Sequence, residues 1–125
     1  MLPFSVTIRP GRPLHDQIVF AVTKSVIAGQ LQAGDRFPSV RALSQELRIN
    51  PNTAMKAVAT LVERGLLQAR PGVGTTVVAW QPLSGAGRRA VLAEQVDRLV
   101  VEAKHLGLDL SDVLDAVRKE WKGKT

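Results

Sequence analysis

The sequence predicts a mainly α-helical fold that contains one small β-hairpin and ends in two further helices. Two observations lead to this fold class. Apolar residues recur at three- and four-residue spacing in five stretches, and only residues 66–79 look like two strands around a Gly-rich turn. A chain of 125 residues that is 45% hydrophobic can form one domain with an appendage.

Composition and charge narrow the function. The net charge is +6, and residues 1–80 carry nine Lys/Arg against four Asp/Glu, so an anionic partner is expected for that part. There is no Cys, and His15 and His105 lie far apart, so we expect no metal and no cofactor. No apolar run approaches the roughly 18 residues that span a bilayer. We therefore expect a cytoplasmic protein without a membrane partner.

The first helix is predicted to begin at Pro13, a residue favoured at the first helical position, and to stop at Gly29. A turn at 33–36 separates it from a short helix over 40–47, which Ser39 can cap through its hydroxyl. The apolar stripe of the first helix consists of Leu14, Ile18, Val22 and Val26.

The third helix has a strong start signal in Asn50-Pro51, an Asn cap followed by Pro, and Gly65 ends it. Strands are predicted at Leu66–Arg70 and Thr75–Ala79 with a Pro-Gly-rich turn between them. Two helices joined by a short turn and followed by a hairpin form a winged helix-turn-helix, whose second helix enters the DNA major groove.

The helical wheel of the third helix separates an apolar face from a polar one. Ala54, Val58 and Leu61 share the apolar face, while Asn52 and Lys56 lie opposite. Asn and Lys match the edges of adenine and guanine. Alone, this pattern more often describes a capped helix with a solvated face; the preceding short helix, the following hairpin and the local positive charge favour DNA.

Further candidates flank that helix. Arg41 lies away from the apolar side of the short helix, and the amides at the start of that helix can receive a phosphate. Arg70 lies at the shoulder of the hairpin, and Gly72 lets its backbone approach a groove. The predicted DNA-binding residues are Ser39, Arg41, Asn50, Asn52, Thr53, Lys56, Arg70 and Gly72.

The run from Pro13 to Ala79 resembles the DNA-binding domain of GntR-type bacterial transcription regulators. The segments GDRFPSVRALS, INPNTAMKA and ERGLLQARPGVGT carry the resemblance. It implies contacts to DNA from the start of the recognition helix and from the wing. Three positions depart from the family pattern: Arg48 replaces a turn glycine, Met55 an arginine, and Val73 a basic residue of the wing tip.

The C-terminal part is predicted to be a separate helical segment. Residues 1–80 form the DNA-binding domain, 81–87 a linker, and 88–125 two helices with a capping box between Asp109 and Asp112. Apolar residues of the first of these helices follow heptad-like spacing. The predicted dimerisation residues are Leu92, Val96, Leu99, Ala103, Leu106, Leu110, Leu114, Val117 and Trp121.

The ending GLDLSDVLDAVRKEW is similar to the short two-helix tail of the YtrA-like branch, which implies dimerisation. Short isolated helices are marginal in water, so another surface must cover these stripes. Folding back onto the chain's own winged helix is the alternative.

The leading hypothesis is therefore a homodimeric, sequence-specific repressor that binds a palindromic operator in double-stranded DNA. The resemblance to the YtrA-like branch implies that this operator controls a transporter operon. An enzyme is the first rival, but the sequence shows no catalytic motif. A winged helix that binds RNA or protein is the second. The sequence leaves open whether a small-molecule effector controls DNA binding.

Overall fold

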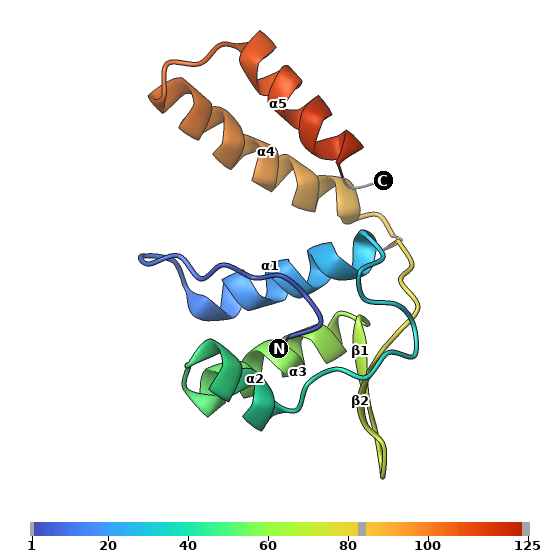
Figure 1. Ribbon diagram of the computed structural model, residues 1–125. Helices are drawn as coiled ribbons and strands as arrows, with labels where there is room; N and C mark the ends of the chain where they lie inside the picture. The colour runs from blue at the N-terminus through green and yellow to red at the C-terminus, as the bar shows by residue number, and fades with distance from the viewer. Residues whose placement is uncertain (1, 83–84, 124–125) are drawn as a thin grey trace. The chain divides into compact units, whose positions relative to one another are not determined.

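The computed structural model describes residues 2–82 and 85–123 and divides into two compact units, residues 1–80 and 81–125. The first unit holds a helix-turn-helix and a hairpin, and the second holds two helices (Figure 1). This arrangement confirms the predicted fold class, a winged helix-turn-helix followed by C-terminal helices. In chain order the elements are α1 (Leu14–Ile27), α2 (Val40–Leu47), α3 (Pro51–Glu63), β1 (Leu67–Arg70), β2 (Gly74–Val77), α4 (Arg88–His105) and α5 (Leu110–Lys122).

Both helices of the helix-turn-helix start at the predicted caps. The Ser39 hydroxyl accepts a hydrogen bond from the Ala42 amide at 3.1 Å, and the Asn50 side-chain oxygen accepts one from the Asn52 amide at 2.8 Å. Each bond satisfies one of the backbone donors that a helix start leaves without a partner. The caps fix where α2 and α3 begin, and thereby which side chains occupy their first turns.

The hairpin is antiparallel, with Leu67 opposite Val77 and Arg70 opposite Gly74. The second strand was predicted to start at Thr75 and to end at Ala79, but it starts one residue earlier because Gly74 completes the pair with Arg70. It ends at Val77. Beyond this residue, the Val78 amide donates a hydrogen bond to the Leu66 carbonyl at 2.9 Å. The short turn therefore brings the strands together one residue closer to the tip than the sequence pattern suggested.

The stretch after the first turn joins the wing as a third extended segment. Arg36 forms an isolated antiparallel bridge with Thr76, and the Phe37 amide donates to the Thr75 carbonyl at 2.8 Å. The sequence predicts only a turn at 33–36. The pairing has no local signal, because the partner lies about forty positions along the chain and residues 35–37 carry no strand pattern of their own.

A single apolar core holds the first unit together. α1 and α2 both pack against α3, and α3 also contacts β1. Ile18, Val22, Leu43 and Leu61 are completely buried at the centre, and Leu67 adds the contribution of the hairpin. The core orients α3, since its buried side must face α1 and α2.

The N-terminal segment belongs to this core, although the sequence analysis gave it no role. Phe4 is 4% exposed and its ring stacks on Phe37, with centroids 5.6 Å apart and an interplanar angle of 9°. Aromatic pairs at this separation gain about 0.5–1.5 kcal/mol beyond their burial. The stack ties the first residues of the chain to the segment that leads into α2.

The second unit is a pair of helices that run in opposite directions (Figure 1). The predicted capping box is present at the start of α5: the Asp109 carboxylate accepts from the Asp112 amide at 3.0 Å, and the Asp112 carboxylate accepts from the Asp109 amide at 3.1 Å. Among the described residues, no helix is long and apolar enough to cross a membrane.

Candidate nucleic-acid interface

The exposed side of α3 follows from its buried side. Ala54, Ala57 and Leu61 are completely buried against α1 and α2, so the opposite side of the helix faces solvent. Asn52 and Lys56 are exposed on it. The wheel placed Val58 on the apolar face; in the structure Val58 is half-buried against the core, and Ala57 beside it is completely buried.

The first turn of α3 combines a cap with a polar surface. Asn50 uses its side-chain oxygen to hold the Asn52 amide, so it acts first on the geometry of the turn. Thr53 is half-buried beside the exposed Asn52. The turn therefore presents its polar groups from a backbone that the cap has already fixed, which lowers the entropy lost when they bind a ligand.

The first turn of α2 likewise combines a side-chain cap with an exposed polar residue. Ser39 is the cap and Arg41 is exposed one residue into the helix. The hydroxyl accepts a hydrogen bond from the Ala42 amide. Backbone amides at a helix start attract anions, because the helix dipole adds a partial positive charge there. Arg41 adds a full charge at the same end.

The connection between α2 and α3 turns through a left-handed residue. Arg48 has φ 54° and ψ 50°, and it is the one non-glycine residue with a positive φ among the described residues. The Ile49 amide donates to the Ser44 carbonyl at 3.0 Å and closes the turn. An L-residue in this conformation stores about 1–2 kcal/mol of strain. The family pattern places a glycine at this position, and a glycine would store less backbone strain there.

The wing presents Arg70 at the end of β1. Gly72 has φ 77° and Gly74 φ 105°, which L-residues rarely adopt, so the turn requires these glycines. Val73 between them is 48% exposed at the tip, which projects away from the helices (Figure 1).

Gln68 is a residue of this site that the sequence analysis missed. With its side-chain amide turned so that the oxygen faces Arg70, that oxygen lies 2.5 Å from Nε and 2.9 Å from Nη2 of the guanidinium. Residues two apart on a strand point to the same side, and this spacing was the available signal. The contact holds the guanidinium beside the strand.

The predicted dimerisation residues lie on α4, α5 and the turn between them. Leu99 is 43% exposed and Trp121 73%, which is unusual for large apolar side chains. Ala103 differs, since it is 7% exposed and therefore already covered within the chain. The predicted residues that remain exposed are Leu92, Val96, Leu99, Leu106, Leu110, Leu114, Val117 and Trp121.

Comparison with known proteins identifies the family. The sequence profile described as "Bacterial regulatory proteins, gntR family" matches residues 14–77, just over half of the chain and all of the helix-turn-helix and hairpin. The HTH-type transcriptional repressor YtrA of Bacillus subtilis (strain 168) is 27% identical over 112 residues, which cover 89% of this chain and 86% of that protein.

A second relative is also a transcriptional regulator, and a solved structure shares the fold. The HTH-type transcriptional regulator Rv1152 of Mycobacterium tuberculosis (strain H37Rv) is 32% identical over 109 residues, which cover 87% of this chain and 86% of the relative. A crystal structure described as a transcriptional antiterminator from Listeria monocytogenes EGD-e shares the fold, with a TM-score of 0.79, 23% identity and coverage of 94% of this chain and 88% of that one.

The relatives extend over both the winged helix-turn-helix and the C-terminal helices, and the YtrA relative confirms the resemblance expected for the two-helix tail. They are named as transcriptional regulators and repressors, not as enzymes. The protein therefore belongs to the gntR family of bacterial regulatory proteins and is a transcription regulator whose winged helix-turn-helix is its DNA-binding domain.

Proposed function

We propose that this regulator binds a two-fold symmetric operator as a homodimer and represses transcription from it. The observation that carries the proposal is the exposed polar first turn of α3, where Asn52 and Lys56 stand on a rigid, capped backbone. A helix start of this kind fits the major groove, whose edges offer a distinct set of donors and acceptors for each base pair.

The contacts divide into two kinds. Asn52 and Lys56 bind base edges and set the sequence preference, with Thr53 beside them. Arg41 and Arg70 bind phosphates and position the protein without specifying sequence. Ser39, Asn50 and Gly72 act through the backbone: two hold the helix starts, and the third lets the wing approach the duplex.

The second unit supplies the dimer contact in this proposal. Residues 88–125 form the dimerisation segment and 81–87 the linker. The apolar residues of α4 that follow heptad-like spacing suit a second copy of the same helix. Their exposure in the single chain supports this assignment, because each large apolar side chain gains about 1.5–3 kcal/mol when it is fully buried.

A symmetric dimer presents two equal α3 helices, so the operator should contain two half-sites on one face of the duplex. The centres of these half-sites should lie about one or two helical turns apart. We further propose, from the similarity to the YtrA-like branch, that the controlled genes include a transporter operon. The protein then acts in the cytoplasm, on the nucleoid.

Selection of bound fragments from genomic DNA, followed by footprinting of the full-length protein, tests this function. We expect a protected palindrome upstream of the controlled genes, saturated by two chains. A single unrepeated site filled by one chain contradicts the dimer. Preference for single-stranded RNA over the duplex in the same binding assay contradicts the DNA-binding role and favours the RNA alternative.

A further inference from the structure

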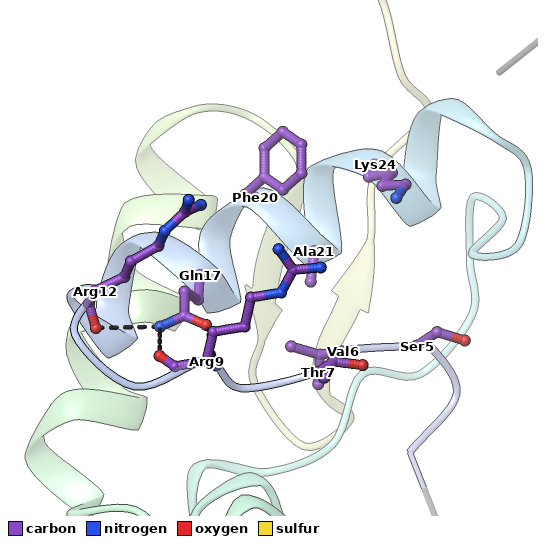
Figure 2. Close-up of a pocket in the computed structure, with 9 residues that line it drawn as sticks. All are labelled: Ser5, Val6, Thr7, Arg9, Arg12, Gln17, Phe20, Ala21 and Lys24. Carbon is purple, nitrogen blue, oxygen red and sulfur yellow. Dashed lines mark hydrogen bonds between the residues drawn. The ribbon is translucent and has the colours of Figure 1, made fainter. Parts of the chain in front are cut away.

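A pocket of about 350 Å³ lies in the first unit, between the N-terminal segment and the outer side of α1. Ser5, Val6 and Thr7 form one wall, and Gln17, Ala21 and Lys24 form part of the other (Figure 2). Its volume falls in the range of small-molecule sites, roughly 300–1,000 Å³. The proposed DNA contacts use none of these residues.

The charged side chains that line the pocket are all positive. Arg9, Arg12 and Lys24 line it, and no carboxylate does. In the part of the chain that the structure describes, none of these three cations forms an ion pair. Three positive charges around one concave surface raise the local concentration of anions. The pocket therefore favours a negatively charged ligand.

Gln17 fixes the backbone at both arginines. The Gln17 side-chain nitrogen donates to the carbonyls of Arg9 at 2.9 Å and Arg12 at 3.1 Å, and its oxygen accepts from the Arg9 amide at 2.7 Å. These three bonds fix the loop before α1 against the helix, as the dashed lines of Figure 2 show in part. In Figure 2 the Arg12 side chain extends from this loop toward Phe20, and the Arg9 side chain extends along α1 toward Ala21.

The pocket also has an apolar wall. Phe20 is 67% exposed, although large aromatic side chains are mostly covered in folded proteins. It occupies the side of α1 opposite to the buried Ile18 and Val22, and therefore faces away from α3. This location separates the pocket from the exposed first turn of α3, which argues for a small ligand and against the DNA backbone.

We propose that this pocket is a binding site for a small organic anion with a flat apolar part, such as an aryl carboxylate or aryl phosphate. Arg9 and Arg12 bind the anionic group, Lys24 adds long-range attraction, and Phe20 covers the apolar part. Guanidinium groups suit this task because their paired donors match carboxylate and phosphate oxygens.

Amide NMR titration of the full-length protein with phenyl phosphate and with benzoate, at constant ionic strength, tests the site. We expect saturable shifts at Thr7, Gln17 and Phe20 in the millimolar range or tighter, and no such shifts with phenol, which lacks the charge. Removing two of the three cations in Arg9→Ala/Arg12→Ala should weaken binding at least about tenfold. The matched control, Arg88→Ala/Arg89→Ala, removes the same charge from exposed positions of α4.

Three results overturn the proposal. The first is the absence of saturable shifts with both probes. The second is equal weakening in both double variants, which shows an effect of net charge alone. The third is a duplex titration in which DNA shifts the same amides and Arg9→Ala/Arg12→Ala reduces the salt dependence of DNA binding, which assigns these cations to phosphate contacts. The small-anion result does not depend on the operator, so failure here leaves the DNA-binding function standing.

Discussion

The Nε2 atom of His15 lies 2.8 Å from the Oγ1 atom of Thr60, and this hydrogen bond joins the first turn of α1 to the last turn of α3. The other ring nitrogen of His15 lies 3.1 Å from a carboxylate oxygen of Asp16. A carboxylate only accepts, so Nδ1 carries a proton, and in the neutral ring Nε2 accepts from the Thr60 hydroxyl. The pair fixes the recognition helix against the scaffold.

Loss of this bond should lower stability without changing the site. His15→Ala and Thr60→Val should each reduce the free energy of unfolding by about 1 kcal/mol, the usual net value of one hydrogen bond. The double variant should lose less than the sum. Urea unfolding at one fixed protein concentration measures all four proteins. Strictly additive losses contradict a direct interaction between the two side chains.

The left-handed turn gives a stabilising substitution. Arg48→Gly should raise the free energy of unfolding by about 0.5–1 kcal/mol, because the relieved strain exceeds the added freedom of the unfolded chain. Arg48→Ala is the matched control, since it removes the charge but keeps the Cβ. The prediction fails if Ala stabilises as much as Gly, because the gain then comes from the lost charge.

The first turn of α3 should set sequence preference. Asn52→Ala and Lys56→Ala should each weaken operator binding by about 1–3 kcal/mol and leave binding to scrambled duplex nearly unchanged. Ala59→Ser is a control on the same exposed side of α3, with a small polar change. Binding isotherms on both duplexes give the specificity ratio. An unchanged ratio assigns recognition to the wing or to Arg41 instead.

The wing arginine should act on every duplex alike. Arg70→Ala should weaken operator and scrambled DNA equally and reduce the salt slope of binding by about 1 per half-site. Gln68→Ala should give a smaller loss on both duplexes with the salt slope retained, because the charge remains but loses its fixed position. DNA titrations at several salt concentrations distinguish the effect of Arg70→Ala from that of Gln68→Ala. A selective loss on the operator in Arg70→Ala contradicts a phosphate role.

The exposed stripe of α4 should hold the dimer. Leu99→Asp should weaken dimerisation at least about 100-fold, because an unpaired charge in an apolar contact costs several kcal/mol. Val101→Asp is the control: Val101 is 62% exposed and lies on the opposite side of the same helix. Sedimentation at micromolar concentration measures the fraction of dimer in both variants. An intact Leu99→Asp dimer excludes this side of α4 as the contact.

Local sequence determined much of this protein. The helix starts at Ser39, Asn50 and Asp109 were predictable, since each cap bonds to an amide only two or three residues ahead and the signal is contained in a short stretch. The short wing turn followed from its glycines for the same reason. The order of these elements was enough to predict the fold class and, with the motifs between 33 and 75, the family.

Tertiary structure decided what depends on distant residues. The bridge from Arg36 to Thr76, the stack of Phe4 on Phe37 and the bond from His15 to Thr60 each join positions more than thirty residues apart. The complete burial of Ala57 and the half-burial of Val58 were likewise decided by the packing of α1 and α2 against α3. The pocket beside α1 also depends on tertiary contacts, since Gln17 bonds to a loop whose own sequence carries no periodic pattern. Such contacts arise from the shape of the folded core, which no short stretch of sequence contains.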